Sequence, residues 1–192
     1  MAETAKTITC MEVEFKPGAH LWLGNEKTPW RVLHVDWEAE TALLIAEKPV
    51  CKRAYHEKDT EITWEACDLR KWLNGEYYEN TFSEEEKAAI LECELKNSDN
   101  PQYGTEGGND TRDRVFLLSI EEAEKYFKDD RDRATGACWW LRSPGRYGFY
   151  VALVFGDGSV YDVGSVNYFG NCVNFRYGVR PALKINLKSD IF

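Results

Sequence analysis

Residues 146 to 177 combine side chains that suit molecular recognition. Tyr and Phe provide large contact areas with few rotatable bonds, while Asn, Ser and Gly adapt their hydrogen bonding to different partners. The chain contains 44 Lys, Glu, Gln, Met and Trp residues, yet none of them falls among these 32 positions. Gly-rich hairpins and loops disfavour Lys, Glu and Met, but Trp is favoured in strands and surface hairpins usually carry some Lys or Glu. Propensity alone therefore does not explain this depletion.

Residues with catalytic or metal-binding chemistry are scattered by comparison. His20, His34 and His56 lie far apart and lack the spacing of metal ligands, so we expect no metal site and no cofactor. The six cysteines form no CxxC pair, which favours reduced thiols over a disulfide framework or a zinc site. The spacing of the His and Cys residues therefore predicts no metal site that would compete with the 146–177 segment.

The elements that must position the 146–177 segment are short strands and helices. Residues 20–48 hold β-type apolar runs broken at Gly24-Asn25 and at 38–40, which predicts an N-terminal β meander. Apolar residues at helical spacing predict a helix over 63–73, with Asn74-Gly75 as its left-handed cap. Two further helices are predicted from a Ser followed three residues later by Glu, at Ser83 and Ser119.

From Cys138 onward the sequence changes to strands and turns, so the fold class is predicted to be α+β. Around the turn at 156–158, period-2 alternation places Ala152, Val154 and Val160 on one face of a hairpin. Leu153, Phe155 and Tyr161 then lie on the opposite face.

The five depleted residue types share a genetic property, because none is encoded by a codon that ends in a pyrimidine. The motifs "WWLRSPG" at 139–145 and "GVRPAL" at 178–183 bracket the depleted window. This arrangement resembles the variable proteins of diversity-generating retroelements. In that family, adenines of a template repeat are mutagenised during reverse transcription, and an Asn codon ending in a pyrimidine becomes one of the remaining fifteen residue types.

The resemblance covers roughly residues 20–187 and implies a C-type-lectin-like fold. It implies an N-terminal β unit, two to three helices and a β-rich C-terminal half that displays the variable side chains on one surface. Residues 1–19 are then an N-terminal extension, residues 20–192 a single domain, and about 139–183 the variable region. The calcium-ligand motifs of sugar-binding lectins are absent, so the fold alone does not predict a calcium site.

Within this scheme each position of the window is either fixed or diversified. The expected fixed positions are Ala152, Val154, Asp157, Gly158, Val160, Gly164, Val166, Val173 and Gly178. The expected ligand contacts are Arg146, Tyr147, Phe149, Tyr150, Leu153, Phe155, Tyr161, Asp162, Asn167, Tyr168, Asn171, Asn174, Phe175, Arg176 and Tyr177. Scaffold roles are predicted for Trp139, Trp140, Arg142, Gly178 and Arg180, since paired Trp buries large apolar area and Arg can tie loops together.

The expected function is metal-independent, non-enzymatic binding of a macromolecular ligand, expected to be a protein. One alternative is an oxidase like the formylglycine-generating enzymes, which share the lectin-like architecture and would use Cys138 and Cys172. Against it, neither cysteine has an obvious neighbour that would depress its pKa. A third possibility is an undiversified structural module of a phage or cell surface.

Net charge and hydropathy restrict the partners further. The formal net charge of −9 argues against attraction to nucleic acid or to anionic membranes. The sequence encodes no signal peptide and no apolar run long enough to span a membrane, so no membrane insertion is expected. A phage particle, the cytoplasm or surface display by another route all remain open as locations.

Overall fold

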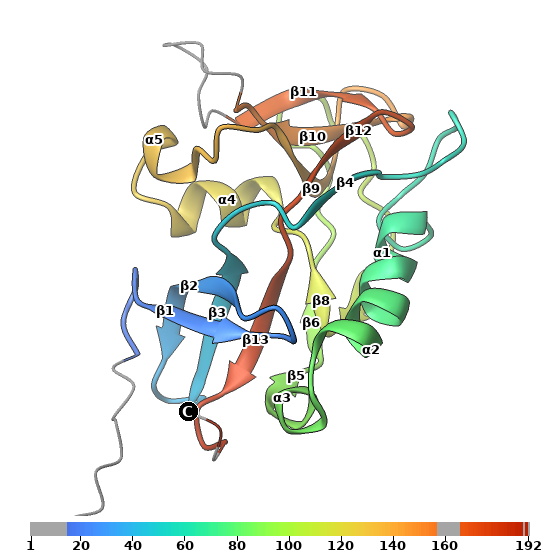
Figure 1. The fold of residues 1–192 in the computed structure, drawn as a ribbon. Coiled ribbons are helices and arrows are strands. Elements are labelled where there is room, and N and C mark those ends of the chain that lie inside the picture. Colours follow the sequence, from blue (N-terminus) through green and yellow to red (C-terminus); the bar gives the residue numbers. More distant parts are fainter. Residues whose placement is uncertain (1–14, 157–165, 190, 192) are drawn as a thin grey trace, which may run out of the picture.

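Two sheets joined by the C-terminal strands organise a mixed α+β fold, in agreement with the predicted class (Figure 1). The computed structural model describes residues 15–156, 166–189 and 191. The expected N-terminal extension therefore lies largely outside the described residues. So do the predicted hairpin turn at 157–158 and the expected fixed positions Val160 and Gly164.

The first sheet contains the predicted N-terminal meander. Its strand order is β1-β2-β3-β13-β5, and β8 also pairs with β13. The strands are β1 (His20–Leu23), β2 (Thr28–Asp36), β3 (Thr41–Ala46), β5 (Ile90–Leu91), β8 (Val115–Phe116) and β13 (Ala182–Asn186). Chain reversals occur at both predicted breaks, so the meander of residues 20–48 is confirmed.

The second sheet carries the segment of interest. Its order is β11-β10-β9-β12-β4, in which β12 runs parallel to β9 and the other pairs are antiparallel. The strands are β4 (Cys51–Ala54), β9 (Trp139–Pro144), β10 (Tyr150–Val154), β11 (Val166–Cys172) and β12 (Arg176–Val179). A separate pair, β6 (Cys93–Leu95) with β7 (Thr111–Asp113), flanks the long loop 97–110.

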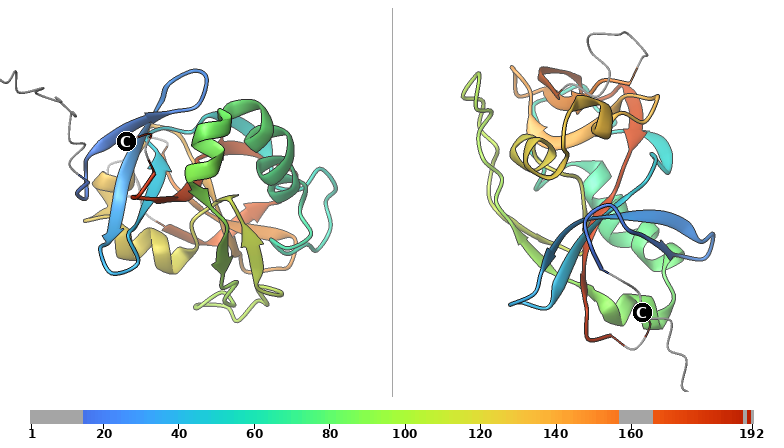
Figure 2. Two further views of the ribbon diagram at one scale, coloured as in Figure 1. Left: turned by 90° about the horizontal axis from the view of Figure 1, so that it is seen from below. Right: turned by 90° about the vertical axis from the view of Figure 1, so that its left-hand side faces the viewer.

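The C-terminal strand passes from one sheet to the other at Pro181. Gly178 and Val179 pair with β4 in the second sheet, whereas Ala182 begins β13 in the first. Proline cannot donate to a strand ladder, which suits a point where the chain changes sheets. Its carbonyl still accepts the Ala46 amide at 2.9 Å. The segment β12–β13 therefore joins the two sheets, and Figure 2 shows it passing from one sheet into the other.

The helices of the fold are short, and both predicted capping boxes are confirmed. Ser83 caps α3 (Glu84–Ala89) and Ser119 caps α4 (Ile120–Tyr126), each with reciprocal bonding to the Glu three residues later. A further short helix, α5, covers Asp130–Arg133. Ala123 and the C-cap residue Phe127 are buried, 0% and 4% exposed, so one face of α4 packs against the core.

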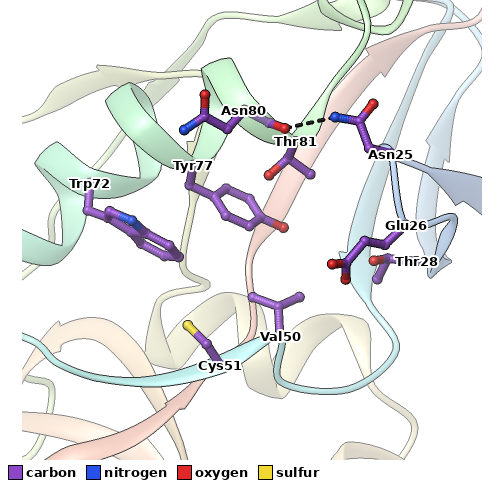
Figure 3. A pocket seen from close by; sticks show the side chains of 9 residues that line it. All are labelled: Asn25, Glu26, Thr28, Val50, Cys51, Trp72, Tyr77, Asn80 and Thr81. Carbon is purple, nitrogen blue, oxygen red and sulfur yellow. Dashed lines mark hydrogen bonds between the residues drawn. The ribbon is translucent and has the colours of Figure 1, made fainter.

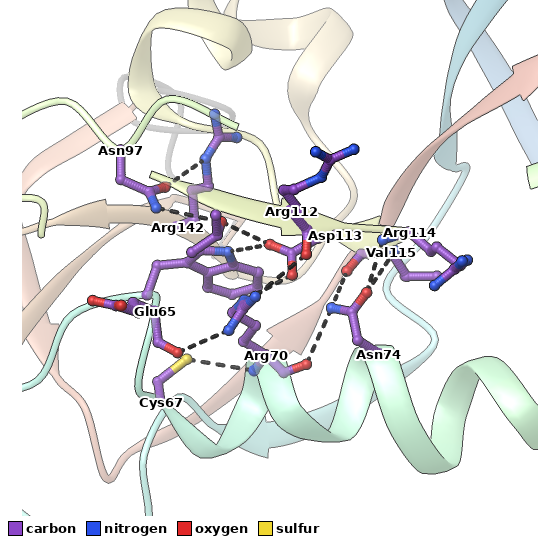
Figure 4. Close-up of polar contacts among 12 residues, drawn as sticks. Glu65, Cys67, Arg70, Asn74, Asn97, Arg112, Asp113, Arg114, Val115 and Arg142 are labelled. Atoms are coloured by element: carbon purple, nitrogen blue, oxygen red, sulfur yellow. Dashed lines mark hydrogen bonds and ion pairs between the residues drawn. The ribbon is translucent and has the colours of Figure 1, made fainter. Parts of the chain in front are cut away.

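The helix predicted over 63–73 begins only at Asp68, and Asn74-Gly75 does not form the predicted left-handed cap. The helical segment comprises α1 (Asp68–Trp72), Leu73–Tyr77 and α2 (Tyr78–Thr81), and it is interrupted by a kink at Gly75, whose φ of −116° and ψ of −105° are not helical. The Asn74 amide has another role: its Nδ2 donates to the Val115 carbonyl at 2.8 Å and its Oδ1 accepts the Arg114 amide at 2.8 Å (Figure 4). Asn74 therefore links the helix to the strand β8.

A buried carboxylate fixes the same helix at its other end. Asp113 is 1% exposed and accepts hydrogen bonds from Trp64 Nε1 at 2.9 Å, Arg70 Nε at 2.7 Å and the Thr111 hydroxyl at 2.9 Å (Figure 4). Arg70 also donates to the Glu65 carbonyl at 2.9 Å. α1 is thus joined to β7, and β7 leads out of the loop 97–110.

A surface ion-pair cluster predicts weaker stability in acid. Burial alone would raise the pKa of Glu47, but hydrogen bonds from Arg31 and His20 outweigh it and lower this pKa from 4.5 to about 2. Its contribution is therefore present above about pH 4.5 and is lost as the pH falls towards 2. Because Glu47 is partly exposed, we expect Glu47→Gln to cost about 1 kcal/mol or less at pH 7.

Urea unfolding at pH 7, 5, 4 and 3 measures this contribution. The difference between the wild type and Glu47→Gln should shrink steadily below pH 4.5. Glu38→Gln, at an exposed position in the turn before β3, is the matched control and should show no such trend. A difference that stays constant down to pH 3 would contradict the assigned pKa.

Candidate functional site

Five aromatic side chains, four of them exposed and Tyr150 half-buried, cluster on and next to the second sheet. Tyr147, Phe149 and Phe169 are 43%, 36% and 38% exposed, and Tyr103 is 37% exposed. Tyr147 stacks on Phe149 with ring centroids 5.6 Å apart, and Tyr150 lies 5.5 Å from both Tyr147 and Phe169. Tyr103 meets the edge of Phe169 at 6.2 Å. We call these five residues the aromatic patch.

Arg146 supplies the positive charge of the aromatic patch. Its guanidinium carbon lies 5.5 Å from the Tyr103 ring, 5.3 Å from Tyr147 and 5.5 Å from Phe169. Cation–π contacts of this kind hold a guanidinium against rings while its donors stay available. Within the described part of the chain, the contacts recorded for the Arg146 guanidinium are those with these three rings. An anionic group of a ligand can therefore pair with it.

Residues outside the 146–177 window hold the backbone that carries the aromatic patch. They do so by donating hydrogen bonds to the main-chain oxygens of that backbone. Asn100 Nδ2 donates to the carbonyls of Pro144 and Tyr168, at 2.8 and 2.9 Å. The Thr105 hydroxyl donates to the Arg146 carbonyl at 2.8 Å, and the Ile62 amide to that of Gly148 at 3.0 Å. These bonds do not depend on which side chain occupies the accepting position.

Close backbone approach explains two glycines in this region. A Cβ at Gly145 would lie 2.5 Å from the Phe169 carbonyl oxygen, and one at Gly170 would lie 2.5 Å from that of Val151. Gly170 also has φ +78°, which disfavours any other residue. These positions let the loop after β9 and the strand β11 lie against β10.

The expected ligand contacts divide by exposure. Arg146, Tyr147, Phe149, Phe175 and Arg176 are exposed. Half-buried positions are Tyr150, Phe155, Asn167, Tyr168, Asn171, Asn174 and Tyr177. Tyr161 and Asp162 lie outside the described residues. The expected fixed positions Ala152, Val154, Val173 and Gly178 are buried, whereas Val166 is half-buried.

The assignment of Leu153 to the ligand contacts is wrong. Leu153 is 1% exposed, and its neighbours Ala152 and Val154 are both 0% exposed. β10 lies between β9 and β11, and both of its faces are covered. Alternation along a strand separates a core face from a solvent face only where one face meets solvent. The alternation of side chains along β10 therefore does not separate ligand contacts from core residues.

Several half-buried candidates have partners within the fold. The Tyr168 hydroxyl donates to Glu124 on α4, and burial together with this hydrogen bond raises the pKa of Tyr168 to about 12. Asn171 Nδ2 donates to the Tyr177 hydroxyl at 2.7 Å. These side chains support the surface, and the exposed ones remain available to a ligand.

The residues expected to be scaffold are buried. Trp139 and Trp140 are 0% exposed, and Trp140 Nε1 donates to the Arg53 carbonyl at 3.0 Å. Arg142 pairs with Glu122 and donates to the Leu117 carbonyl at 2.8 Å and the Lys96 carbonyl at 3.2 Å. The Arg180 guanidinium is fully buried, and burial lowers its pKa to about 9. Gly178 is also buried, against Pro49 and the Cys138 carbonyl.

Cys138 and Cys172, the pair considered for oxidase chemistry, are half-buried free thiols. A hydrogen bond with Cys172 raises the pKa of Tyr150. Burial, with a smaller contribution from the charge of Cys138, raises the pKa of Tyr177. Among the described residues, no group of three or more His, Cys, Asp and Glu side chains could hold a metal ion.

A separate cavity of about 280 Å³ lies away from the aromatic patch (Figure 3). It opens between the β1–β2 turn, the start of β4 and the helix pair α1–α2. Trp72 and Tyr77 form its aromatic wall, with Glu26 and Cys51 opposite. Burial raises the pKa of Tyr77. All of its lining residues lie outside the 146–177 window.

Sequence reasoning missed two members of the aromatic patch. Phe169 stands between the expected fixed positions Val166 and Val173, and this spacing was a usable signal for it. Tyr103 lies more than 40 residues before the window, in the loop "NPQYGTEGG". A lone Tyr in a polar loop carries no sequence signal, and only the fold brings it to Phe169.

The fold and the patch define an α+β protein that carries an exposed Arg and aromatic surface on its second sheet. Residues 39–187 match the family described as a domain of unknown function (DUF6273), and the chain belongs to this family. No curated protein and no solved structure matches the chain. Among the described helices, none is long and apolar enough to cross a membrane.

Proposed function

We propose that this protein binds a protein ligand through the aromatic patch and is a retroelement-diversified member of the C-type-lectin-like fold. Binding requires no metal and no covalent chemistry in this proposal. Affinity comes from a few aromatic anchors at the centre of the surface, with Arg146 pairing a carboxylate of the ligand.

The observation that carries the proposal is where the exposed rings occur. Four of the five patch residues lie within the 32 positions that lack Lys, Glu, Gln, Met and Trp. Phe175, 50% exposed, lies in the same window. A core function for this aromatic-rich stretch would leave these rings covered, and it would not place the exposed Arg146 guanidinium over three of them.

The way in which the surface is held supports diversification. Asn100, Thr105 and Ile62 bind the window through its main-chain oxygens, so their hydrogen bonds tolerate a change of side chain at Tyr168, Arg146 or Gly148. Buried scaffold residues such as Trp139 and Trp140 lie before the window begins. A surface built in this way can change its contacts while its fold stays the same.

Selection of peptide ligands tests the binding function directly. Random 12-residue peptides displayed on phage are selected on the wild-type protein, and the dissociation constants of enriched peptides are measured by calorimetry. The triple variant Tyr147→Ser, Phe149→Ser, Phe169→Ser removes three exposed rings. We expect it to weaken binding at least about tenfold, since interface aromatics commonly contribute more than about 1 kcal/mol each.

Trp22→Ser with Trp37→Ser is the matched control, because these rings are 60% and 67% exposed but lie in the N-terminal meander. The control variant should bind the enriched peptides as the wild type does. Equal binding by the triple patch variant, with an unchanged melting temperature, would refute the proposed site. A loss of cooperative melting would instead assign the three rings to the core.

The diversification part of the proposal has its own genetic test. The DNA flanking this gene should carry a near-copy of the segment encoding residues 139–183, differing mainly at adenines, next to a reverse transcriptase gene. An intact locus without such a repeat would leave an undiversified binding or structural module as the better description.

A further inference from the structure

We infer that Tyr103, which lies outside the expected variable region 139–183, is a fixed ligand contact and that Asn100 is its positioning residue. This inference rests on the proposed binding function and extends its site to a second segment of the chain. It assigns part of the recognition surface to a residue that diversification cannot change.

Tyr103 belongs to the aromatic patch by geometry. Its ring is 37% exposed, meets the edge of Phe169 at 6.2 Å and lies beneath the Arg146 guanidinium at 5.5 Å. Any ligand group that pairs with Arg146 over these rings therefore lies close to Tyr103. Tyrosine is well suited to such contacts, because it offers apolar area and a hydroxyl at a low entropic cost.

The loop that carries Tyr103 has defined internal structure. The backbone N–H of Asn100 donates to the backbone carbonyl of Thr105 at 2.9 Å. The backbone N–H of Gly104 donates to the backbone carbonyl of Asn100 at 2.8 Å. Asn100 Oδ1 accepts the amides of Gln102 and Tyr103 at 2.9 and 3.0 Å. These four bonds fix the backbone on both sides of Tyr103.

The same Asn100 side chain joins this loop to the second sheet. It is 1% exposed, and its Nδ2 donates to the carbonyls of Pro144 on β9 and Tyr168 on β11. One amide group therefore uses its oxygen for the Tyr103 loop and its nitrogen for the variable segment. Because both acceptors are main-chain oxygens, Tyr103 keeps its place beside the sheet when the residue at position 168 changes.

The chemistry of the occupant follows from the three groups that meet here. Tyr103 and Phe169 present ring edges and faces to an apolar side chain, and the exposed Arg146 presents guanidinium donors to a carboxylate. The partner is therefore a protein segment with an Asp or Glu carboxylate beside an apolar residue. Charge complementarity with Arg146 favours this over a basic segment.

The experiment uses the enriched 12-residue peptides as probes, on the full chain. We expect Tyr103→Ala to raise their dissociation constants about five- to tenfold and Tyr103→Phe to change them less than about twofold, as a ring contact requires. Trp37→Ala is the control for loss of an exposed ring elsewhere. The peptides should also be enriched in Asp or Glu, and Arg146→Gln should abolish the preference for them.

Asn100 is tested by a spectroscopic signature as well as by affinity. In the wild type, NMR should record cross-relaxation between the Tyr103 and Phe169 rings. Asn100→Ala should remove this signal and weaken peptide binding to the level of Tyr103→Ala, and the double variant should bind no more weakly than either single one.

The outcomes separate this inference from the proposed function. If the triple patch variant loses binding while Tyr103→Ala binds as the wild type does, the proposed function stands and the fixed contact is refuted. If neither variant loses binding, the aromatic patch is not the site at all. An Asn100→Ala variant that keeps both the ring signal and full affinity would refute the positioning role.

Discussion

Replacing Trp140 with alanine is expected to lower the free energy of unfolding by about 3–5 kcal/mol, the range for removing a large buried aromatic. Trp140 is 0% exposed on β9, between Tyr55 at 6.1 Å and Tyr177 at 4.9 Å, both in edge contact. Its Nε1 is the donor to the Arg53 carbonyl on β4. The substitution therefore leaves a cavity and removes one hydrogen bond between β9 and β4 in the sheet that carries the aromatic patch.

Urea unfolding followed by tryptophan fluorescence and circular dichroism measures this loss. Trp140→Phe is the graded control: it keeps most of the ring volume but loses the hydrogen bond, so we expect about 1–2 kcal/mol. Trp37→Ala, at a 67% exposed position, should change stability by less than about 0.5 kcal/mol. A Trp140→Ala protein as stable as the wild type would remove Trp140 from the scaffold.

The second large effect is expected at Asp113, where Asp113→Ala should cost about 3 kcal/mol or more. The substitution removes the acceptor of three donors at once, and it leaves Trp64 Nε1 in a site that is 1% exposed. Arg70 loses an ion pair whose carboxylate side is fully buried. A buried donor without an acceptor costs about 1–3 kcal/mol, and breaking a buried ion pair costs more than a surface one.

Thermal and urea unfolding of Asp113→Ala, Asp113→Asn and Arg70→Met separate these contributions. Asp113→Asn retains one acceptor oxygen and should lose less than Asp113→Ala. Arg70→Met leaves the fully buried Asp113 carboxylate without its counter-ion and should therefore lose more than Asp113→Asn. If all three variants lost the same free energy, the ion pair and not the Trp64 hydrogen bond would account for the effect.

Local rules predicted much of the fold because short-range interactions decide those features. Both capping boxes formed, since a Ser and a Glu three residues apart satisfy each other's helix-end donors without help from the rest of the chain. The meander over 20–48 formed because each short turn joins two strands that are consecutive in the sequence and pair directly with each other. By contrast, Asn74 was predicted to cap a helix. Its side-chain amide instead forms hydrogen bonds with the backbone of Val115, in the strand β8.

The candidate site was predictable only in part for the same physical reason. The depleted window contains Arg146, Tyr147 and Phe149, which were expected to contact a ligand, and the structure places these three side chains at the surface. The window could not place Leu153, whose burial depends on the two strands that flank β10. Exposure is a property of the assembled sheet and not of one strand.

The sequence by itself therefore determined the fold class, the helix starts at Ser83 and Ser119, and the segment from which most of the aromatic patch comes. The tertiary structure alone decided which side chains of that segment face solvent and which distant residues join them. Tyr103 lies against Phe169 in a loop that Asn100 joins to main-chain oxygens of β9 and β11, contacts made across more than 40 residues. Long-range hydrogen bonds and burial have no local sequence signature, so they appear only when the chain is folded.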